Sequence, residues 1–270
     1  MMIIEQMLKN AQTPLLHIAD VSGSALFLGD CLEIMCKIPK ESIDFICCDL
    51  PYGVTAMEWD KIIPMDKLWE QYERIIKPNG AIALFSQGIF THKLALSNEK
   101  LYRYQWVWVK NQPSGITTAN IRPMRNHEDI LVFYKKQPTY NKQLVKSKIT
   151  DRKTGVSNGK LTSQYSATNG IKQLKKKDNP ENIMRTFVNP RTVLEYNVPP
   201  MSKGRLHQNQ KPIDLIEMLI KTYTNENDLV LDNTAGSGTT CLAAKELNRK
   251  FIGIEKEPKY YEIACQRCGF

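Results

Sequence analysis

Long apolar runs are missing from this chain. None approaches the ~18 residues that a membrane helix needs. The first residues, interrupted by Glu5, Lys9 and Asn10, also lack the continuous apolar core of a signal peptide. These absences predict a cytoplasmic protein without membrane contact.

Cysteine occurs seven times, but not in a pattern that builds disulfides or a zinc site. Cys47, Cys48 and Cys241 lie inside apolar stretches, which favours reduced and buried thiols. Cys265 and Cys268 form a lone C-x-x-C without a second pair at zinc spacing. We therefore expect neither a disulfide framework nor a metal site.

Acidic residues are scarce between Lys135 and Arg191, where 14 Lys or Arg accompany only three Asp or Glu. The whole chain carries a formal net charge of +9, so the remainder is close to neutral. Such a segment is typical either of a solvated surface or of a contact with nucleic-acid phosphates, where each bound cation releases a counterion. Composition alone leaves both interpretations open.

Short apolar runs bounded by turn residues recur along the chain and predict buried strands. They occupy residues 25–28, 43–48, 81–85, 106–109, 130–134, 229–231 and 251–254. Helix-like stretches with one apolar face, such as 65–76 and 212–223, lie between them. This alternation predicts an α/β fold with a doubly wound, mostly parallel, Rossmann-like sheet covered on both faces.

Residues 141–195 lack this alternation and are rich in Lys, Asn, Ser, Thr and Gly. We interpret them as an inserted basic segment. Residues 20–140 and 196–270 would together form the main domain.

Residues 229–255 follow the order strand, small-residue turn, helix, strand. Gly236 and Gly238 permit positive φ and let a ligand approach the backbone, next to the unpaired N–H groups of a helix start. Glu255 ends the second strand, where it can accept hydrogen bonds from ribose hydroxyls. The pattern therefore indicates a nucleoside-binding βαβ unit.

Two residues of this unit favour one cofactor over another. Cys241 stands where a dinucleotide fingerprint has Gly or Ala. Asp232, just before the turn, would repel a pyrophosphate but suits the cationic amino-acid end of S-adenosyl-L-methionine (AdoMet). AdoMet is therefore the expected cofactor, and an NAD-dependent oxidoreductase is the weaker alternative.

The stretch CCDLPYG, residues 47–53, ends an apolar run with an acid, a proline and an aromatic residue. Pro51 fixes its own φ and drives Leu50 into an extended conformation, so the chain from Asp49 to Tyr52 is stiff. A stiff segment can hold a carboxylate, a carbonyl and an aromatic ring in a constant relation. A capping Asp at a surface turn is the simpler alternative.

Residues 49–52 (DLPY) resemble the D/N/S-P-P-Y motif of the amino-methyltransferases that methylate adenine N6 or cytosine N4 in DNA. Residues 232–240 resemble their AdoMet-binding D-x-F-x-G-S-G-T-T segment, and residues 207–212 their H-P-x-Q-K-P segment. Stretches at 29–30, 106–110 and 126–129 fit the same pattern. The order is that of the β class, in which residues 141–195 occupy the place of the target-recognition region.

The resemblance implies a restriction-modification methyltransferase that acts on duplex DNA by base flipping. Asp49 and the Leu50 carbonyl would accept hydrogen bonds from the target amine, Pro51 would keep the segment rigid, and Tyr52 would stack on the flipped base. The residues it implies for AdoMet binding are Asp30, His207, Lys211, Asp232, Thr234, Ala235, Gly236, Gly238, Thr239, Thr240 and Glu255.

The chain departs from the family pattern at two positions. Leu50 replaces the first proline of the motif but keeps the backbone carbonyl. Thr234 replaces the usual aromatic residue of the AdoMet loop, which removes an expected stacking contact with the cofactor's adenine.

Several alternatives remain beside the main interpretation. Aspartate rather than serine at position 49 favours adenine N6 over cytosine N4, by family analogy. A cytosine-N4 enzyme and a non-catalytic DNA-binding protein are the other candidates. The residues decide neither the recognition sequence nor whether a homodimer or a cognate restriction endonuclease exists.

Overall fold

The computed structural model describes residues 2–10, 16–19, 23–53, 60–146, 187–199 and 210–270. The chain divides into two compact units, Met1–Thr139 with Thr192–Phe270, and Tyr140–Arg191. The helices are α1 (Met2–Asn10), α2 (Cys31–Met35), α3 (Met65–Ile75), α4 (Ile89–Ser97), the 3-10 turn η1 (Ile116–Thr118), α6 (Ile213–Tyr223), α7 (Thr239–Glu246) and α8 (Pro258–Cys268). The strands are β1 (Leu16–Ala19), β2 (Ala25–Leu28), β3 (Ile43–Asp49), β4 (Ile76–Ser86), β5 (Tyr102–Ser114), β6 (Arg125–Phe133), β7 (Val145–Lys146), β8 (Phe187–Val188), β9 (Val193–Glu195), β10 (Leu229–Asp232) and β11 (Lys250–Glu255).

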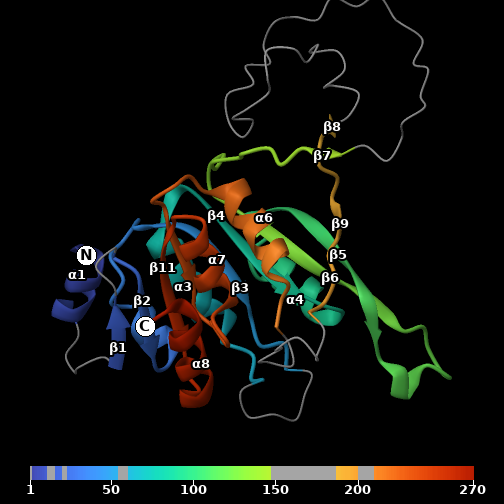
Figure 1. The fold of residues 1–270 in the computed structure, drawn as a ribbon, viewed down its shortest axis with the longest axis horizontal. Coiled ribbons are helices and arrows are strands. Elements are labelled where there is room, and N and C mark those ends of the chain that lie inside the picture. Colours follow the sequence, from blue (N-terminus) through green and yellow to red (C-terminus); the bar gives the residue numbers. More distant parts are fainter. Residues whose placement is uncertain (1, 11–15, 20–22, 54–59, 147–186, 200–209) are drawn as a thin grey trace, which may run out of the picture. The chain divides into compact units, whose positions relative to one another are not determined.

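The first unit is built on a nine-stranded sheet in the order β1-β2-β11-β10-β3-β4-β6-β5-β9 (Figure 1). The five neighbours from β2 to β4 run parallel, and β9 runs parallel to β5. The pairings β1–β2, β4–β6 and β6–β5 are antiparallel. The predicted α/β fold with a mostly parallel sheet is confirmed.

Strand β3 shows why helices cover both faces of this sheet. Its side chains point alternately to opposite faces, and both sets are apolar, as expected for a central parallel strand. Phe45 and Cys47 join a core with α6, α7 and α8. Ile46 and Cys48 join a second core with α2, α3 and α4. The sheet is therefore doubly wound, as the sequence predicts.

Helix α3 ends where the sequence predicts, and the chain enters β4 directly. It buries Leu68, Trp69, Tyr72 and Ile75 on one face. The K-P-N-G stretch after it forms an irregular start of β4, because the pairing with β3 shifts register within this stretch. A proline is tolerated at such an irregularity because no regular ladder bond is lost there.

The C-terminal boundary of the inserted segment differs from the sequence interpretation. Val193 of β9 pairs with Val107 of β5, so residues 193–195 belong to the main sheet. In the second unit, the described residues include β7 and β8, which pair antiparallel at Val145 and Val188. The predicted segment 141–195 otherwise falls largely on residues 147–186, which lie outside the described residues.

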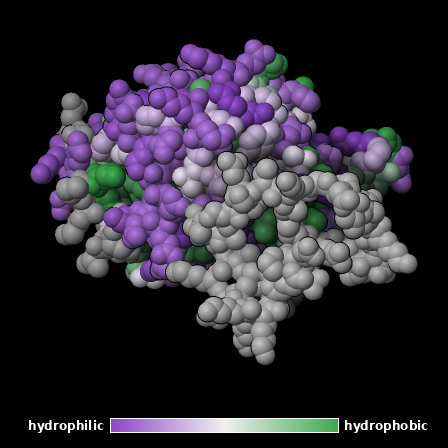
Figure 2. Space-filling view, turned by 90° about the horizontal axis from the view of Figure 1, so that it is seen from above, coloured by the Kyte–Doolittle hydropathy of each residue, from purple (hydrophilic) through white to green (hydrophobic). Residues whose placement is uncertain are grey.

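Most of the coloured surface in Figure 2 is hydrophilic, and hydrophobic side chains form only small groups on that face. Within the described ranges, every helix is too short or too polar to cross a bilayer. All seven cysteines lie in described parts of the chain and are free thiols.

Candidate active site

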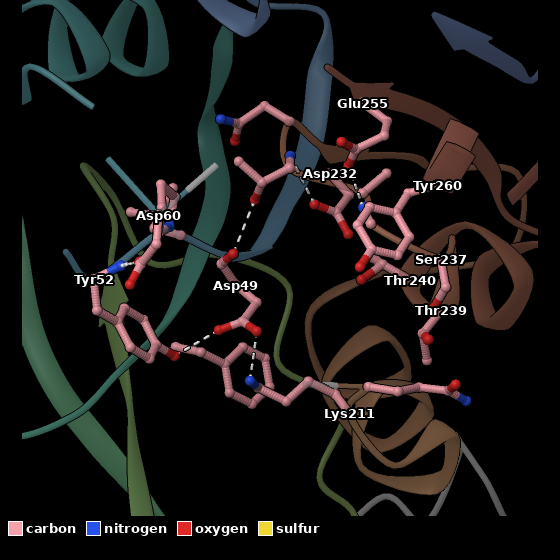
Figure 3. A pocket seen from close by; sticks show the side chains of 18 of the residues that line it. Asp49, Tyr52, Asp60, Lys211, Asp232, Ser237, Thr239, Thr240, Glu255 and Tyr260 are labelled. Atoms are coloured by element: carbon pink, nitrogen blue, oxygen red, sulfur yellow. Dashed lines mark hydrogen bonds and ion pairs between the residues drawn. The ribbon is translucent and has the colours of Figure 1, made fainter. Parts of the chain in front are cut away.

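Three acidic side chains meet where three neighbouring parallel strands end. Asp49 is the last residue of β3, Asp232 of β10 and Glu255 of β11. The carboxyl ends of parallel strands share one edge, and open α/β sheets bind ligands there. Figure 3 shows Asp49 between a group with Tyr52 and Asp60 and a second group with Asp232 and Glu255.

Both carboxylate oxygens of Asp49 accept a hydrogen bond from a side chain (Figure 3). The Tyr52 hydroxyl donates to Oδ1 at 2.5 Å, and the Lys211 Nζ donates to Oδ2 at 2.5 Å. Burial, together with the charge of Asp49, raises the pKa of Tyr52 well above its usual value, so the phenol keeps its proton. Each carboxylate oxygen can accept one further hydrogen bond from a ligand.

The turn after Asp49 is fixed by a second carboxylate, that of Asp60. Its Oδ1 accepts the backbone N–H groups of Tyr52 at 2.8 Å and of Gly53 at 2.9 Å. Gly53 has φ of 67°, a left-handed conformation that glycine adopts without steric cost. Together with Pro51, this anchor sets the position of the Leu50 carbonyl and the Tyr52 ring.

Lys211 joins Asp49 to a buried chain of charges. Its Nζ lies 3.3 Å from Glu128 Oε2, and Glu128 Oε1 accepts from Lys110 Nζ at 3.0 Å. Burial lowers the pKa of Lys211, but the carboxylates of Asp49 and Glu128 outweigh it and the pKa is raised. Burial raises the pKa of Glu128, but Lys211 and Lys110 outweigh it and the pKa is lowered. Lys211 and Glu128 therefore stay charged near neutral pH.

The turn after β10 connects the three strand ends to one another. Thr234 Oγ1 donates to the backbone carbonyl of Asp49 at 3.1 Å, and Thr234 N–H donates to Asp232 Oδ1 at 3.1 Å. The N–H of Gly236 donates to Glu255 Oε2 at 2.6 Å. These hydrogen bonds hold the ends of β3, β10 and β11 in a fixed relation to one another.

The two glycines of this turn are needed for different structural reasons. Gly236 has φ of 53°, and a Cβ there would meet nothing within 4 Å, which leaves space for a ligand. Gly238 has φ of 75°, and a Cβ there would lie 2.9 Å from the Cβ of Ala264 in α8. Helix α7 begins directly after it, with Thr239 and Thr240 buried in the first turn.

Asp232 is 5% exposed, and burial raises its pKa to about 7 although the Thr240 hydroxyl and the Thr234 N–H lower it. A cationic ligand group beside it would favour the charged form. The electrostatics of Asp232 therefore suit a ligand with an ammonium group.

Asp30, just after β2, and Glu255, at the end of the neighbouring strand β11, also line the site. Asp30 caps α2, because its Oδ1 accepts the N–H of Leu32 at 2.9 Å. Glu255 Oε1 accepts the N–H of Glu257 at 2.8 Å, and burial raises the pKa of Glu255. Its carbonyl accepts the N–H of Gly29 at 2.9 Å, which holds the two strand ends together.

These groups line one cavity of about 730 Å³. The sequence-derived site residues that line it are Asp30, Asp49, Leu50, Pro51, Tyr52, Lys211, Asp232, Thr234, Ala235, Gly236, Thr239, Thr240 and Glu255. Gly238 instead packs against α8, and His207 lies outside the described residues.

The cavity is also lined by residues to which the sequence assigned no role, among them Asp60, Lys110, Glu128 and Tyr260. Lys110 and Glu128 fall in the stretches that resemble the family, which is the only sequence signal that points to them. Asp60 and Tyr260 belong to no motif. Figure 3 shows the Tyr260 ring beside Asp232 and Thr240.

The N6/N4 family model described as DNA methylase matches residues 43–266. The type II methyltransferase M.HindIII of Haemophilus influenzae is 29% identical, over 90% of this chain and 94% of the relative. The M1.HpyAVI–SAM complex is 25% identical with a TM-score of 0.59, over 91% of this chain and 98% of that chain. The cytosine-N4-specific PvuII DNA methyltransferase, 18% identical, shares the fold with a TM-score of 0.64 over 90% of this chain and 86% of that chain.

Proposed function

The chain belongs to the N6/N4 DNA methylase family, and we propose that it transfers the methyl group of AdoMet to the exocyclic N6 of adenine at specific sites in duplex DNA. The DNA methyltransferase activity and the AdoMet cofactor follow from the family. The choice of adenine and the roles of individual residues are the proposal.

The observation that carries the proposal is the environment of Asp49. Its carboxylate is held by Tyr52 and Lys211 at the rim of the cavity whose other wall contains Asp232 and Glu255. A target amine and a methyl donor that are both bound in this one cavity would lie next to each other at Asp49. Methyl transfer needs such positioning more than it needs acid catalysis.

The adenine amine is a weak nucleophile because its lone pair is delocalised into the ring. Asp49 and the Leu50 carbonyl would each accept one of its N–H groups and draw the nitrogen toward tetrahedral geometry. The new N–C bond forms as the S–C bond of the sulfonium breaks, and the sulfur leaves as a neutral thioether. The methylated nitrogen then loses one proton, for which Asp49 is the positioned acceptor.

The cofactor would lie along the ends of β10 and β11. Asp232 suits the ammonium of the methionine end, because its raised pKa reflects burial that a cation would offset. Glu255 suits the ribose hydroxyls, and Gly236 leaves room for the backbone approach. Lys211, for which the sequence suggests cofactor contact, has its Nζ on Asp49, so we assign it to holding that carboxylate.

The target base would be flipped out of the duplex and stacked on Tyr52, whose ring packs on Phe90 with centroids 5.1 Å apart. Aspartate at position 49 favours adenine. Cytosine N4 is the alternative, since the family contains enzymes of both kinds.

The test is the identity of the methylated nucleoside. We would incubate the protein with tritiated AdoMet and DNA from a host without methylases, digest the DNA and separate the nucleosides by chromatography. We expect the label in N6-methyldeoxyadenosine. Label in N4-methyldeoxycytidine would replace the proposed target, and unlabelled DNA would overturn the proposal.

A further inference from the structure

The hairpin formed by β5 and β6 ends in a tip, residues 115–124, that carries two exposed isoleucines. Ile116 is 72% exposed and Ile121 is 82% exposed, the largest fractions among the exposed large hydrophobic side chains of the described ranges. In Figure 1 the hairpin extends beyond the rest of the sheet. Single exposed apolar residues are common, but two on one short projection indicate a contact surface.

The tip is an ordered turn. Gly115 has φ of 93° and directly precedes η1, and the Thr118 hydroxyl donates to the Gly115 carbonyl at 3.0 Å. The N–H of Ile121 donates to the Thr118 carbonyl at 3.0 Å, and Arg122 Nε donates to Thr118 Oγ1 at 3.0 Å. The exposed isoleucines are therefore held on a folded scaffold, which lowers the entropic cost of using them in a contact.

The same hairpin forms part of the cavity wall. Gln112, Pro113 and Ser114, the last residues of β5 before the tip, line the cavity together with Asp49 and Tyr52. A base that enters the cavity must therefore leave its helix close to this hairpin.

The charge of the hairpin end fits a polyanion. From Asn111 to His127 the sequence holds Arg122 and Arg125 and no acid. Arg125 NH1 donates to Gln87 Oε1 at 2.7 Å, at the start of the loop before α4. Proteins that kink or open a duplex combine such cations with apolar wedges, often Ile or Leu, between base steps.

We propose that this tip docks on duplex DNA and that Ile116 and Ile121 enter the stack beside the flipped base. The inference rests on the proposed function. Flipping leaves a gap in the base stack, and apolar side chains that fill it would offset part of the unstacking cost. Arg122 would contact the neighbouring backbone phosphate.

The test compares the double variant I116A/I121A with the wild type on two duplexes that carry the recognition sequence, which is first mapped by locating the bases that the wild type methylates in genomic DNA. One duplex is fully paired, and the other has an abasic site opposite the target base, which makes flipping less costly. We expect kcat/KM on the paired duplex to fall about tenfold or more, a fall of less than about threefold on the abasic duplex, and an unchanged Kd for AdoMet. L16A is the matched control, because Leu16 is 61% exposed on β1, at the opposite edge of the sheet.

Unchanged rates on both duplexes would overturn the inference, and so would equal losses on both. A changed sedimentation coefficient with normal rates would overturn it too, by showing that the tip contacts a second copy of the chain. Failure of the proposed function gives a different result, since the wild type would then label neither duplex at adenine.

Discussion

The hydroxyl of Thr234 donates a 3.1 Å hydrogen bond to the backbone carbonyl of Asp49, so the turn after β10 is tied to the end of β3. Thr234 stands where the motif that residues 232–240 resemble has an aromatic residue. In this chain the position connects the cofactor side of the cavity to the target side rather than stacking on the cofactor.

Replacing Thr234 by Val should lower kcat by about two- to twelvefold, because a net hydrogen bond of about 0.5–1.5 kcal/mol is lost. T234S keeps the hydroxyl and should retain most of the activity. Single-turnover methylation of DNA measures the effect. A T234V variant as active as the wild type would show that this bond does not position Asp49.

Removing the cation of Lys211 should damage both catalysis and stability. K211M leaves Asp49 and Glu128 without their shared partner, and breaking a buried pair costs about 3–5 kcal/mol. Urea unfolding measures the loss. K221M is the control, because the Lys221–Glu217 pair on α6 is more exposed and is worth about 0.5 kcal/mol or less.

The same variant separates two roles of Lys211. If it holds Asp49, K211M lowers the rate of methylation much more than it weakens AdoMet binding. A large rise in the Kd for AdoMet at an unchanged single-turnover rate would instead establish the cofactor contact suggested by the sequence.

AdoMet binding should strengthen as pH rises through about 7. Burial raises the pKa of Asp232 to about 7, and only the ionised carboxyl attracts the ligand ammonium. Titration calorimetry between pH 6 and pH 8 measures the trend, and proton release should accompany binding at the lower pH. An affinity independent of pH over this range would remove Asp232 from the ammonium site.

Asp232 should also reduce the stability of the ligand-free protein. Its pKa is higher in the folded state than the ordinary value of 3.8, so the folded protein favours the protonated carboxyl more than the unfolded chain does. This contribution to stability is fully present below pH 3.8 and is lost as pH rises through 7, where the buried carboxyl must ionise. D232N should therefore be more stable than the wild type at pH 8, by up to about 4 kcal/mol, and bind AdoMet poorly. The gain should shrink toward pH 4. A variant that is less stable at pH 8 would contradict this.

The basic segment should supply the salt dependence of DNA binding. Lys146 of β7 pairs with Phe187 of β8, so a short Gly-Ser linker between these two residues can replace residues 147–186. We expect the variant to bind DNA weakly, with a flatter dependence of log K on log salt, because each phosphate contact contributes about −0.9 to that slope. Neutralising Lys175, Lys176 and Lys177 should flatten it by up to about 3. An unchanged slope would place the phosphate contacts elsewhere.

The sequence predicts the sheet and the acids at its edge because both depend on local patterns. Apolar runs mark the strands, and parallel strands bring Asp49, Asp232 and Glu255 to one edge whatever the loops do. The partners of Asp49 are less accessible to prediction. Lys211 lies 162 positions away along the chain, and nothing local specifies that its side chain turns to β3 instead of the cofactor.

The ends of the strands in the β5–β6 hairpin could not be predicted from the sequence for a different reason. The predicted strands 106–109 and 130–134 cover only the apolar parts of β5 and β6. In the structure β5 continues to Ser114, and β6 begins at Arg125. Their ends are polar, so composition suggests a loop, and the strand pairing there is set by the partner strand rather than by side-chain pattern.

The most direct test of the role of Asp49 is the methylation activity of Asp49→Ala measured beside its AdoMet affinity. Asp66→Ala, which changes an exposed aspartate at the start of α3, is the control. We expect D49A to label adenine at least a hundredfold more slowly, with a Kd for AdoMet within about threefold of the wild type, and D66A to behave as the wild type. A D49A variant that still methylates adenine at the wild-type rate would contradict the central role of Asp49.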